Sequence, residues 1–236
     1  VPSGMIGTSV GDDLLGHHVA DTLKRMGVQG QVRFTDKYKT ALEVNVSDKK
    51  GARTYFWQRS EEILSTLDTA DLSLIKNSKL LYVDWYDGDT HVIRAMEEAR
   101  RHNVPVFLNF EHGHQHPELL KKYSGLVTVC QAVTDAAQIG KKQAMLGVAR
   151  KLINSGIKTA IITMASQGCM VVQGDEIIRA YAPKVKAVDA SGAGATFSSG
   201  FAYGYLNGWD LEETVRFAIA AASLKVTRSG LVMFPV

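Results

Sequence analysis

The sequence has few of the features that mark a secreted, membrane-bound or nucleic-acid-binding protein. Its 236 residues include only two cysteines, Cys130 and Cys169, which form neither a disulfide framework nor a CxxC metal site. No apolar run is long enough to span a bilayer, and no signal peptide is visible. The net charge is only +3 and no Lys/Arg-rich block stands out. We therefore predict a protein of the reducing cytoplasm, with no membrane or nucleic-acid partner.

What the chain does contain is enough apolar sequence for a sizeable core, since 45% of its residues are hydrophobic. This length fits one large α/β domain, or one domain with a small appendage. The chain starts at Val1 rather than Met, and it enters at once into what reads as the middle of a domain. We expect an N-terminal portion to precede it.

Strand-like and helix-like segments alternate along most of the chain, which predicts a mostly parallel sheet with crossover helices. The expected strands are 80–84, 104–109, 126–129 and 159–163. The expected helices are 89–102, 116–123, 136–154, 194–206 and a last helix that runs from the N-cap Asp210 through Val226. Glu213 follows Asp210 by three residues, which is a capping-box pattern.

Two predicted β-hairpins interrupt this alternation. The first pairs 41–47 with 53–58, and the second pairs 169–172 with 176–180 across Gly174. We interpret 31–58 as a small lid, and 1–30 together with 59–236 as the α/β domain.

Residues 187–201, AVDASGAGATFSSGF, read as a strand that turns into a helix. A helix N-terminus offers unpaired N–H groups and a positive dipole end, and glycine lets a phosphate approach the backbone. No lysine follows Gly192-Ala193-Gly194, which excludes a Walker A loop. Phe197 stands where a GxGxxG motif has its third glycine. Taken alone, the stretch fits an anion site and a plain turn equally well.

Two further stretches carry side chains that suit chemistry. His112, His114 and His116 alternate just after a predicted strand and suit Zn²⁺, which would indicate a metal-dependent hydrolase. No partner HxxH or HxxE motif accompanies them, so a surface loop is the favoured interpretation. Residues 163–168, TMASQG, form a turn at a strand end, where open α/β sheets bind ligands.

Together these segments resemble the ribokinase/PfkB family of carbohydrate kinases. Residues 189–197, DASGAGATF, are similar to the family's late signature Asp-Thr-x-Gly-Ala-Gly-Asp-x-Phe. Residues 10–16, VGDDLLG, resemble its early Val-Gly-x-Asp-x-x-Gly motif, and 163–168 resemble its Thr-Leu-Gly-x-x-Gly turn. Residues 40–56 look like its β-lid, and 228–230 look like the turn after its last helix. The spacing is most similar to that of ketohexokinase-like members.

The resemblance implies a ribokinase-like, three-layer, doubly wound α/β fold with a mostly parallel sheet and a small β-lid. It implies transfer of the γ-phosphoryl group of ATP, with Mg²⁺, to a sugar hydroxyl or a similar alcohol. The lid would close over the sugar and exclude water, and two chains would pair through it as a homodimer. The implied site residues are Gly192, Ala193 and Gly194 as the anion hole, Thr163 and Gly168 for the nucleotide phosphates, Ile219, Ala222 and Val226 for the adenine, and Asp13 on the sugar side.

The sequence departs from the family pattern at the position of the general base. The second Asp of the signature is Ala195 here, and a methyl group cannot accept a proton. Ala165 replaces a signature glycine, and no clear Asn-x-x-Glu motif lies in 131–135. We expect weak or absent phosphoryl transfer, from either an engineered knock-out or a natural pseudokinase with a binding or regulatory role.

Overall fold

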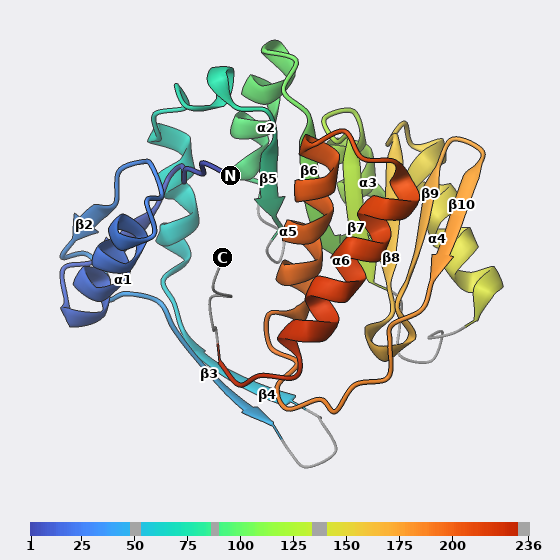
Figure 1. The fold of residues 1–236 in the computed structure, drawn as a ribbon. Coiled ribbons are helices and arrows are strands. Elements are labelled where there is room, and N and C mark those ends of the chain that lie inside the picture. The colour runs from blue at the N-terminus through green and yellow to red at the C-terminus, as the bar shows by residue number, and fades with distance from the viewer. Residues whose placement is uncertain (48–52, 86–89, 134–140, 231–236) are drawn as a thin grey trace. The chain divides into compact units, whose positions relative to one another are not determined.

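The computed structural model describes residues 1–47, 53–85, 90–133 and 141–230 (Figure 1). The chain divides into two compact units, Val1–Asn77 and Ser78–Val236. Residues 1–30 and 59–77 thus group with the hairpin at 31–58, whereas the domain prediction placed them with the large sheet. Each unit has its own secondary structure, and the two are described separately.

The C-terminal unit is built on a six-stranded sheet in the order β10-β9-β8-β7-β6-β5. The strands are β5 (Leu81–Asp84), β6 (Val106–Glu111), β7 (Val129–Val133), β8 (Thr159–Thr163), β9 (Cys169–Gln173) and β10 (Glu176–Ala180). Strands β5 to β8 are parallel, and β9 and β10 add an antiparallel edge. The predicted mostly parallel sheet and its second hairpin are confirmed.

One predicted strand boundary is wrong. The sequence placed a strand at 126–129, whereas β7 begins at Val129 and continues to Val133. The amides of Leu126 and Val127 instead donate to the carbonyls of Tyr123 and Ser124, which closes the preceding helix. An apolar run can therefore belong to a helix end as well as to a strand, and periodicity alone does not separate the two.

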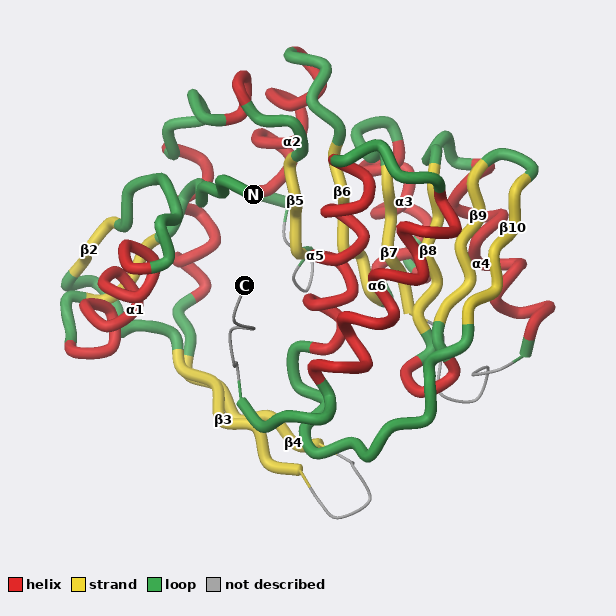
Figure 2. The backbone as a smooth tube through the Cα atoms, in the orientation of Figure 1, coloured by secondary structure: helices red, strands yellow, loops and turns green. Residues whose placement is uncertain are grey.

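Helices cover both faces of this sheet (Figures 1 and 2). Helices α2 (Val92–Arg101), α3 (Pro117–Ser124) and α4 (Lys142–Asn154) lie on one face, and α5 (Ala193–Leu206) and α6 (Leu211–Lys225) lie on the other. The carboxylate of Asp210 accepts the Glu213 amide at 2.7 Å, so the predicted cap of the last helix is confirmed. Residue 89 of the predicted helix 89–102 and residues 136–140 of the predicted helix 136–154 lie outside the described residues.

Helices α5 and α6 pack closely because small residues face each other. A Cβ atom on Gly200 would lie 2.9 Å from the Cα of Ala218, and one on Gly204 would lie 2.6 Å from the Thr214 hydroxyl. Beneath them, the Phe201 ring meets that of Phe107 on β6 edge-on, with centroids 5.8 Å apart. This packing fixes the direction of α5, and hence the place of its first turn.

The N-terminal unit contains a short parallel pair, β1 (Ser9–Gly11) and β2 (Arg33–Thr35), and one α-helix, α1 (Leu14–Arg25). The 3₁₀ turns η1 (Glu61–Thr69) and η2 (Ile75–Asn77) close it. The predicted first hairpin is confirmed as β3 (Leu42–Ser47) and β4 (Arg53–Gln58).

Alternate residues of this hairpin place apolar side chains on one face. Leu42, Val44 and Val46 of β3 share that face with Phe56 of β4, and all four are about half exposed. Pairing of two chains through this hairpin stays a prediction, which the molar mass in solution would test. Among the described residues, no helix has the length and apolarity needed to cross a membrane.

Candidate functional site

The first turn of α5 presents two amides that no group in the described part of the chain accepts. Gly192 caps the helix in the left-handed region, at φ 75° and ψ 3°, which glycine adopts without strain. The Ala193 amide donates to the Ala190 carbonyl at 3.2 Å, and the Thr196 amide donates to Gly192 at 2.9 Å. The N–H groups of Gly194 and Ala195 remain, both on exposed residues. Of the three predicted anion-hole amides, that of Ala193 is thus occupied, those of Gly192 and Gly194 have no acceptor among the described residues, and that of Ala195 joins them.

Asp189 anchors this turn to the end of α6. Its carboxylate accepts the amides of Ser191 at 2.8 Å and Gly230 at 3.0 Å, and it forms an ion pair with the buried Lys225 ammonium at 3.3 Å. The hydrogen bond from the Ser191 amide is the main cause that holds the pKa of Asp189 far below its ordinary value. A carboxylate with so low a pKa is a poor proton acceptor, which argues against Asp189 as a substitute for the base of the family signature.

The end of α6 is joined to the same turn through backbone hydrogen bonds. The Val226 carbonyl accepts the amides of Val188 at 2.7 Å and Asp189 at 3.1 Å. Ile219 belongs to the core under α5, and Ala222 packs against the edge of that core. The three residues predicted for the adenine therefore lie on α6 and its C-cap, which the segment before the first turn of α5 contacts.

Polar side chains from several parallel strands gather at the carboxyl edge of the sheet, which the sequence analysis did not single out. The buried Ser198 hydroxyl donates to the Gln131 side chain on β7 at 2.9 Å, which links α5 to this edge. The side-chain Nδ2 of Asn109 donates to the Asp84 carboxylate at 2.7 Å, while the buried Asn109 Oδ1 has no partner among the described residues. Asp84 and Asn109 are the last residues of two predicted strands, 80–84 and 104–109, which was the only signal in the sequence.

Two ionisable groups at this edge have raised pKa values. Desolvation raises the pKa of Asp84, although the hydrogen bond from Asn109 acts in the opposite direction. Burial, and then the charge of Asp84, raise the pKa of Tyr82 to about 12. The edge thus combines hydrogen-bonding groups with a partly desolvated carboxylate, as ligand sites of open α/β sheets do.

The turn after β8 lies at the same edge. The Thr163 hydroxyl donates to the Ala132 carbonyl of β7 at 3.4 Å. Gly168 adopts φ 84°, and Ala165 adopts φ 47°, a region that favours glycine. This conformation gives a physical reason why the family motif has glycine where this chain has Ala165.

The three histidines do not form the cluster that the hydrolase alternative required. His114 is buried, with its Nε2 3.0 Å from the Val133 carbonyl oxygen, whereas His112 and His116 are exposed. The alternation argument assumed an extended backbone, but Gly113–Gln115 forms a 3₁₀ turn that separates the side chains. Within the described ranges, no group of three or more His, Cys, Asp or Glu residues could hold a metal ion.

Asp13 lies in the N-terminal unit, where its carboxylate caps α1. One oxygen accepts the Gly16 amide at 2.8 Å and the Thr40 hydroxyl at 2.7 Å, and the other accepts the Thr40 amide at 2.9 Å. The Thr40 amide is the largest cause that lowers the pKa of Asp13 to about 2. These bonds tie the helix to the residue that precedes the hairpin, and a sugar contact for Asp13 stays a prediction.

This environment predicts how Asp13 contributes to stability as the pH changes. Because the folded pKa of about 2 lies below the ordinary 3.8, the stabilisation is complete above about pH 4 and is lost as the pH falls towards 2. Asp13→Asn should therefore lower the urea midpoint strongly near pH 5 and by a smaller amount near pH 3, where part of the stabilisation is already lost. Asp36→Asn, at an exposed aspartate of the same unit, is the control. An equal loss at both pH values would contradict the prediction.

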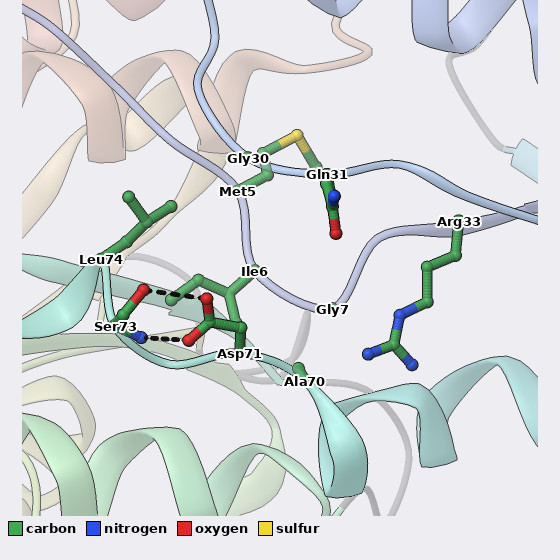
Figure 3. Close-up of a pocket in the computed structure, with 10 residues that line it drawn as sticks. All are labelled: Met5, Ile6, Gly7, Gly30, Gln31, Arg33, Ala70, Asp71, Ser73 and Leu74. Carbon is green, nitrogen blue, oxygen red and sulfur yellow. Dashed lines mark hydrogen bonds between the residues drawn. The ribbon is translucent and has the colours of Figure 1, made fainter.

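A pocket of about 210 Å³ also lies in the N-terminal unit (Figure 3). The Arg33 guanidinium at its wall donates to the Thr69 hydroxyl at 3.1 Å and carbonyl at 2.9 Å. The Asp71 carboxylate is occupied by the amide and hydroxyl of Ser73. None of the residues predicted from sequence lines this pocket, so the candidate site remains at the sheet edge.

The sheet, its two helical layers and its polar carboxyl edge define a ribokinase-like α/β protein. The structure is similar to that of a putative ribokinase II from E. coli in complex with ATP and Mg²⁺, with a TM-score of 0.79 and 19% identity over 98% of this chain and 78% of the other. It is also similar to Arabidopsis thaliana ribokinase complexed with ribose and ATP, with a TM-score of 0.76 and 22% identity over 97% and 77% of the two chains.

The chain belongs to the pfkB family of carbohydrate kinases, whose sequence pattern matches residues 3–234. It is 24% identical to an ATP-dependent 6-phosphofructokinase of Thermoanaerobacterium thermosaccharolyticum, over 98% of this chain and 76% of that protein. It is 25% identical to a deoxyribokinase of Salmonella typhi, over 94% and 75% of the two chains. The predicted family and fold are confirmed, while the ketohexokinase-like subtype stays a prediction.

Proposed function

We propose that this chain binds ATP and a sugar or sugar-like alcohol, and that its phosphoryl transfer is weak or absent because Ala195 stands in the place of the base. The observation that carries the proposal is the pair of unoccupied amides of Gly194 and Ala195 on the first turn of α5. Such amides stabilise the negative charge of a phosphoryl group during transfer. A pseudokinase with a binding or regulatory role differs from this proposal only in whether any transfer remains.

The structure offers a suitable environment for the nucleotide. The amides of Gly194 and Ala195 would bind phosphate oxygens, and the turn at 163–168 would bind others from the same edge of the sheet. Ala222 and Val226, at the partly exposed end of α6, would border the adenine, and the buried Ile219 would support them from the core. Mg²⁺ fits if phosphate oxygens supply most of its ligands, as is usual for this ion, because the described residues form no metal cluster of their own.

The acceptor side of the site would use the carboxyl edge of the sheet. Asn109 Oδ1 is buried without a partner among the described residues. A substrate hydroxyl that donates to this oxygen would therefore satisfy a buried acceptor, which is costly to leave without a hydrogen bond. Asp84, which Asn109 holds in place, would accept a second hydroxyl. A polyol suits this pair better than an apolar alcohol, because it brings several donors at fixed spacing.

The direct test is ATP binding, with Gly194→Leu as the informative variant. A side chain at Gly194 meets no atom within 4 Å, so leucine fits the free protein but would occupy the space that a phosphate needs. We expect the Kd for ATP to rise at least about tenfold while the thermal midpoint does not fall, because leucine favours helix.

Gly147→Leu on α4 is the matched control, because that helical glycine also has no atom within 4 Å of an added Cβ. It should leave ATP binding unchanged. Isothermal titration with Mg²⁺ present measures all three proteins. Failure of the unchanged chain to bind ATP would overturn the proposal.

A further inference from the structure

The turn at 164–168 is held in place by one side chain from another strand, Arg179 of β10. Its Nη1 donates to the carbonyls of Cys169 at 2.9 Å and Ala180 at 2.7 Å, and its Nη2 donates to the Gln167 carbonyl at 2.7 Å. The exposed Tyr181 ring covers the guanidinium, with its centroid 4.2 Å from the Arg179 Cζ. The planar guanidinium suits this role because its donors lie in a fixed arrangement.

Within the turn itself, the buried Met164 side chain and three backbone hydrogen bonds are the other contacts that hold its conformation. Its internal hydrogen bonds are those of a single 3₁₀ turn, Gln167 to Met164 at 2.9 Å and Gly168 to Ala165 at 3.1 Å, with Met164 to Gly168 across its base at 2.9 Å. Ala165 has a positive φ that is unfavourable for a residue with a side chain. A Cβ on Gly168 would collide with the Ala180 carbonyl, so the turn packs directly on the strand that carries Arg179.

Arg179 also brings a positive charge to this turn. All three of its acceptors are neutral carbonyl oxygens, and within the described residues no carboxylate forms an ion pair with it. The amides of Ala165 and Ser166 have no acceptor in the same part of the chain. A fixed cation beside unoccupied amides attracts a polyanion more strongly than an uncharged molecule.

We infer that Arg179 is a positioning residue for the nucleotide phosphates: it fixes the turn at 164–168 through the Gln167 carbonyl, and its charge favours the phosphates without contact to the nucleotide. This inference rests on the proposed function, in which that turn binds phosphate. Arg179 lies eleven residues after Gly168, outside the turn motif, so the contact depends on the pairing of β9 with β10.

The test compares Arg179→Gln with Arg150→Gln, which removes the same charge from an exposed arginine of α4. Isothermal titration measures the Kd for ATP and for adenosine, which lacks phosphates. Arg179→Gln should raise the Kd for ATP about tenfold, because it removes the positive charge and the charge-assisted hydrogen bond that fixes the turn. The Kd for adenosine should stay unchanged, because adenosine has no phosphates. Arg179→Lys, which keeps the charge without the planar fork, should recover only part of the ATP affinity.

Hydrogen–deuterium exchange separates this inference from the proposed function. The exchange rates of the Gln167 and Gly168 amides should rise in Arg179→Gln and stay unchanged in Arg150→Gln, with or without nucleotide. Unchanged exchange at these amides would overturn the positioning role even if ATP binds. Faster exchange with equal losses for ATP and adenosine would overturn the role in phosphate binding. If the unchanged chain binds neither ligand, the proposed function fails and the nucleotide role of Arg179 fails with it.

Discussion

Replacement of Ala195 by Asp is expected to raise the rate of sugar phosphorylation by about 10² to 10⁴, the usual contribution of a general base. Ala195 is exposed on the first turn of α5, beside the two unoccupied amides. A carboxylate there would lie next to the acceptor hydroxyl and take its proton as the phosphoryl group transfers. The new charge also sits favourably at a helix N-terminus, so the variant should fold.

The measurement is ADP release in the presence of ATP, Mg²⁺ and a panel of pentoses, hexoses and their phosphates. Ala195→Asn is the control, because it matches the size of aspartate without a basic carboxylate. An equal gain from Asn and Asp would show that shape rather than proton transfer limits the reaction. If neither variant gains activity while ATP still binds, the pseudokinase alternative is favoured, and the loss lies elsewhere than position 195.

Replacement of Phe201 by Ala is expected to lower the free energy of unfolding of the C-terminal unit by about 3–5 kcal/mol. Phe201 is only 1% exposed, between the rings of Phe107 at 5.8 Å and Phe197 at 6.4 Å. Its removal leaves a cavity between α5 and the sheet, where the close contact of Gly200 with Ala218 limits how far the helices can relax.

Urea unfolding followed by far-ultraviolet circular dichroism measures this loss. Phe217→Ala is the control, because this ring of the next helix is 41% exposed and buries less surface. Its loss should be clearly smaller. Equal losses from the two variants would contradict the packing described between α5 and the sheet.

Much of the fold could be predicted from sequence because its determinants are local. The hydrophobic runs, the Gly174 turn and the Asp210 cap each act over a few residues, and the strands and helices that they predict are present. The family signature at 189–197 likewise lies in one continuous stretch. The error at 126–129 arose where a helix end and a strand start share one apolar run.

The roles of single side chains at the candidate site could not be predicted in this way. The family signature begins at Asp189, but no local pattern indicated its fixed partners, Lys225 and Gly230, which lie 36 and 41 residues away. The alternation of His112, His114 and His116 implied a shared face, whereas the 3₁₀ turn buries only His114. The contacts of Asp189 join segments that are distant in sequence, whereas a local 3₁₀ turn separates the histidines.

Sequence alone was thus sufficient for the alternating α/β pattern and the family, because periodicity, capping and a contiguous motif are properties of neighbouring residues. The loss of the base at Ala195 stays a prediction. The tertiary structure alone brought Asp84 next to Asn109, joined Ser198 to Gln131 and placed Arg179 against Gln167. The physical reason is tertiary arrangement: strand order pairs Asp84 with Asn109, and the packing of α5 on the sheet brings Ser198 to Gln131. Local patterns predicted the hairpin that returns Arg179 to the turn, but they did not indicate the side-chain contact itself.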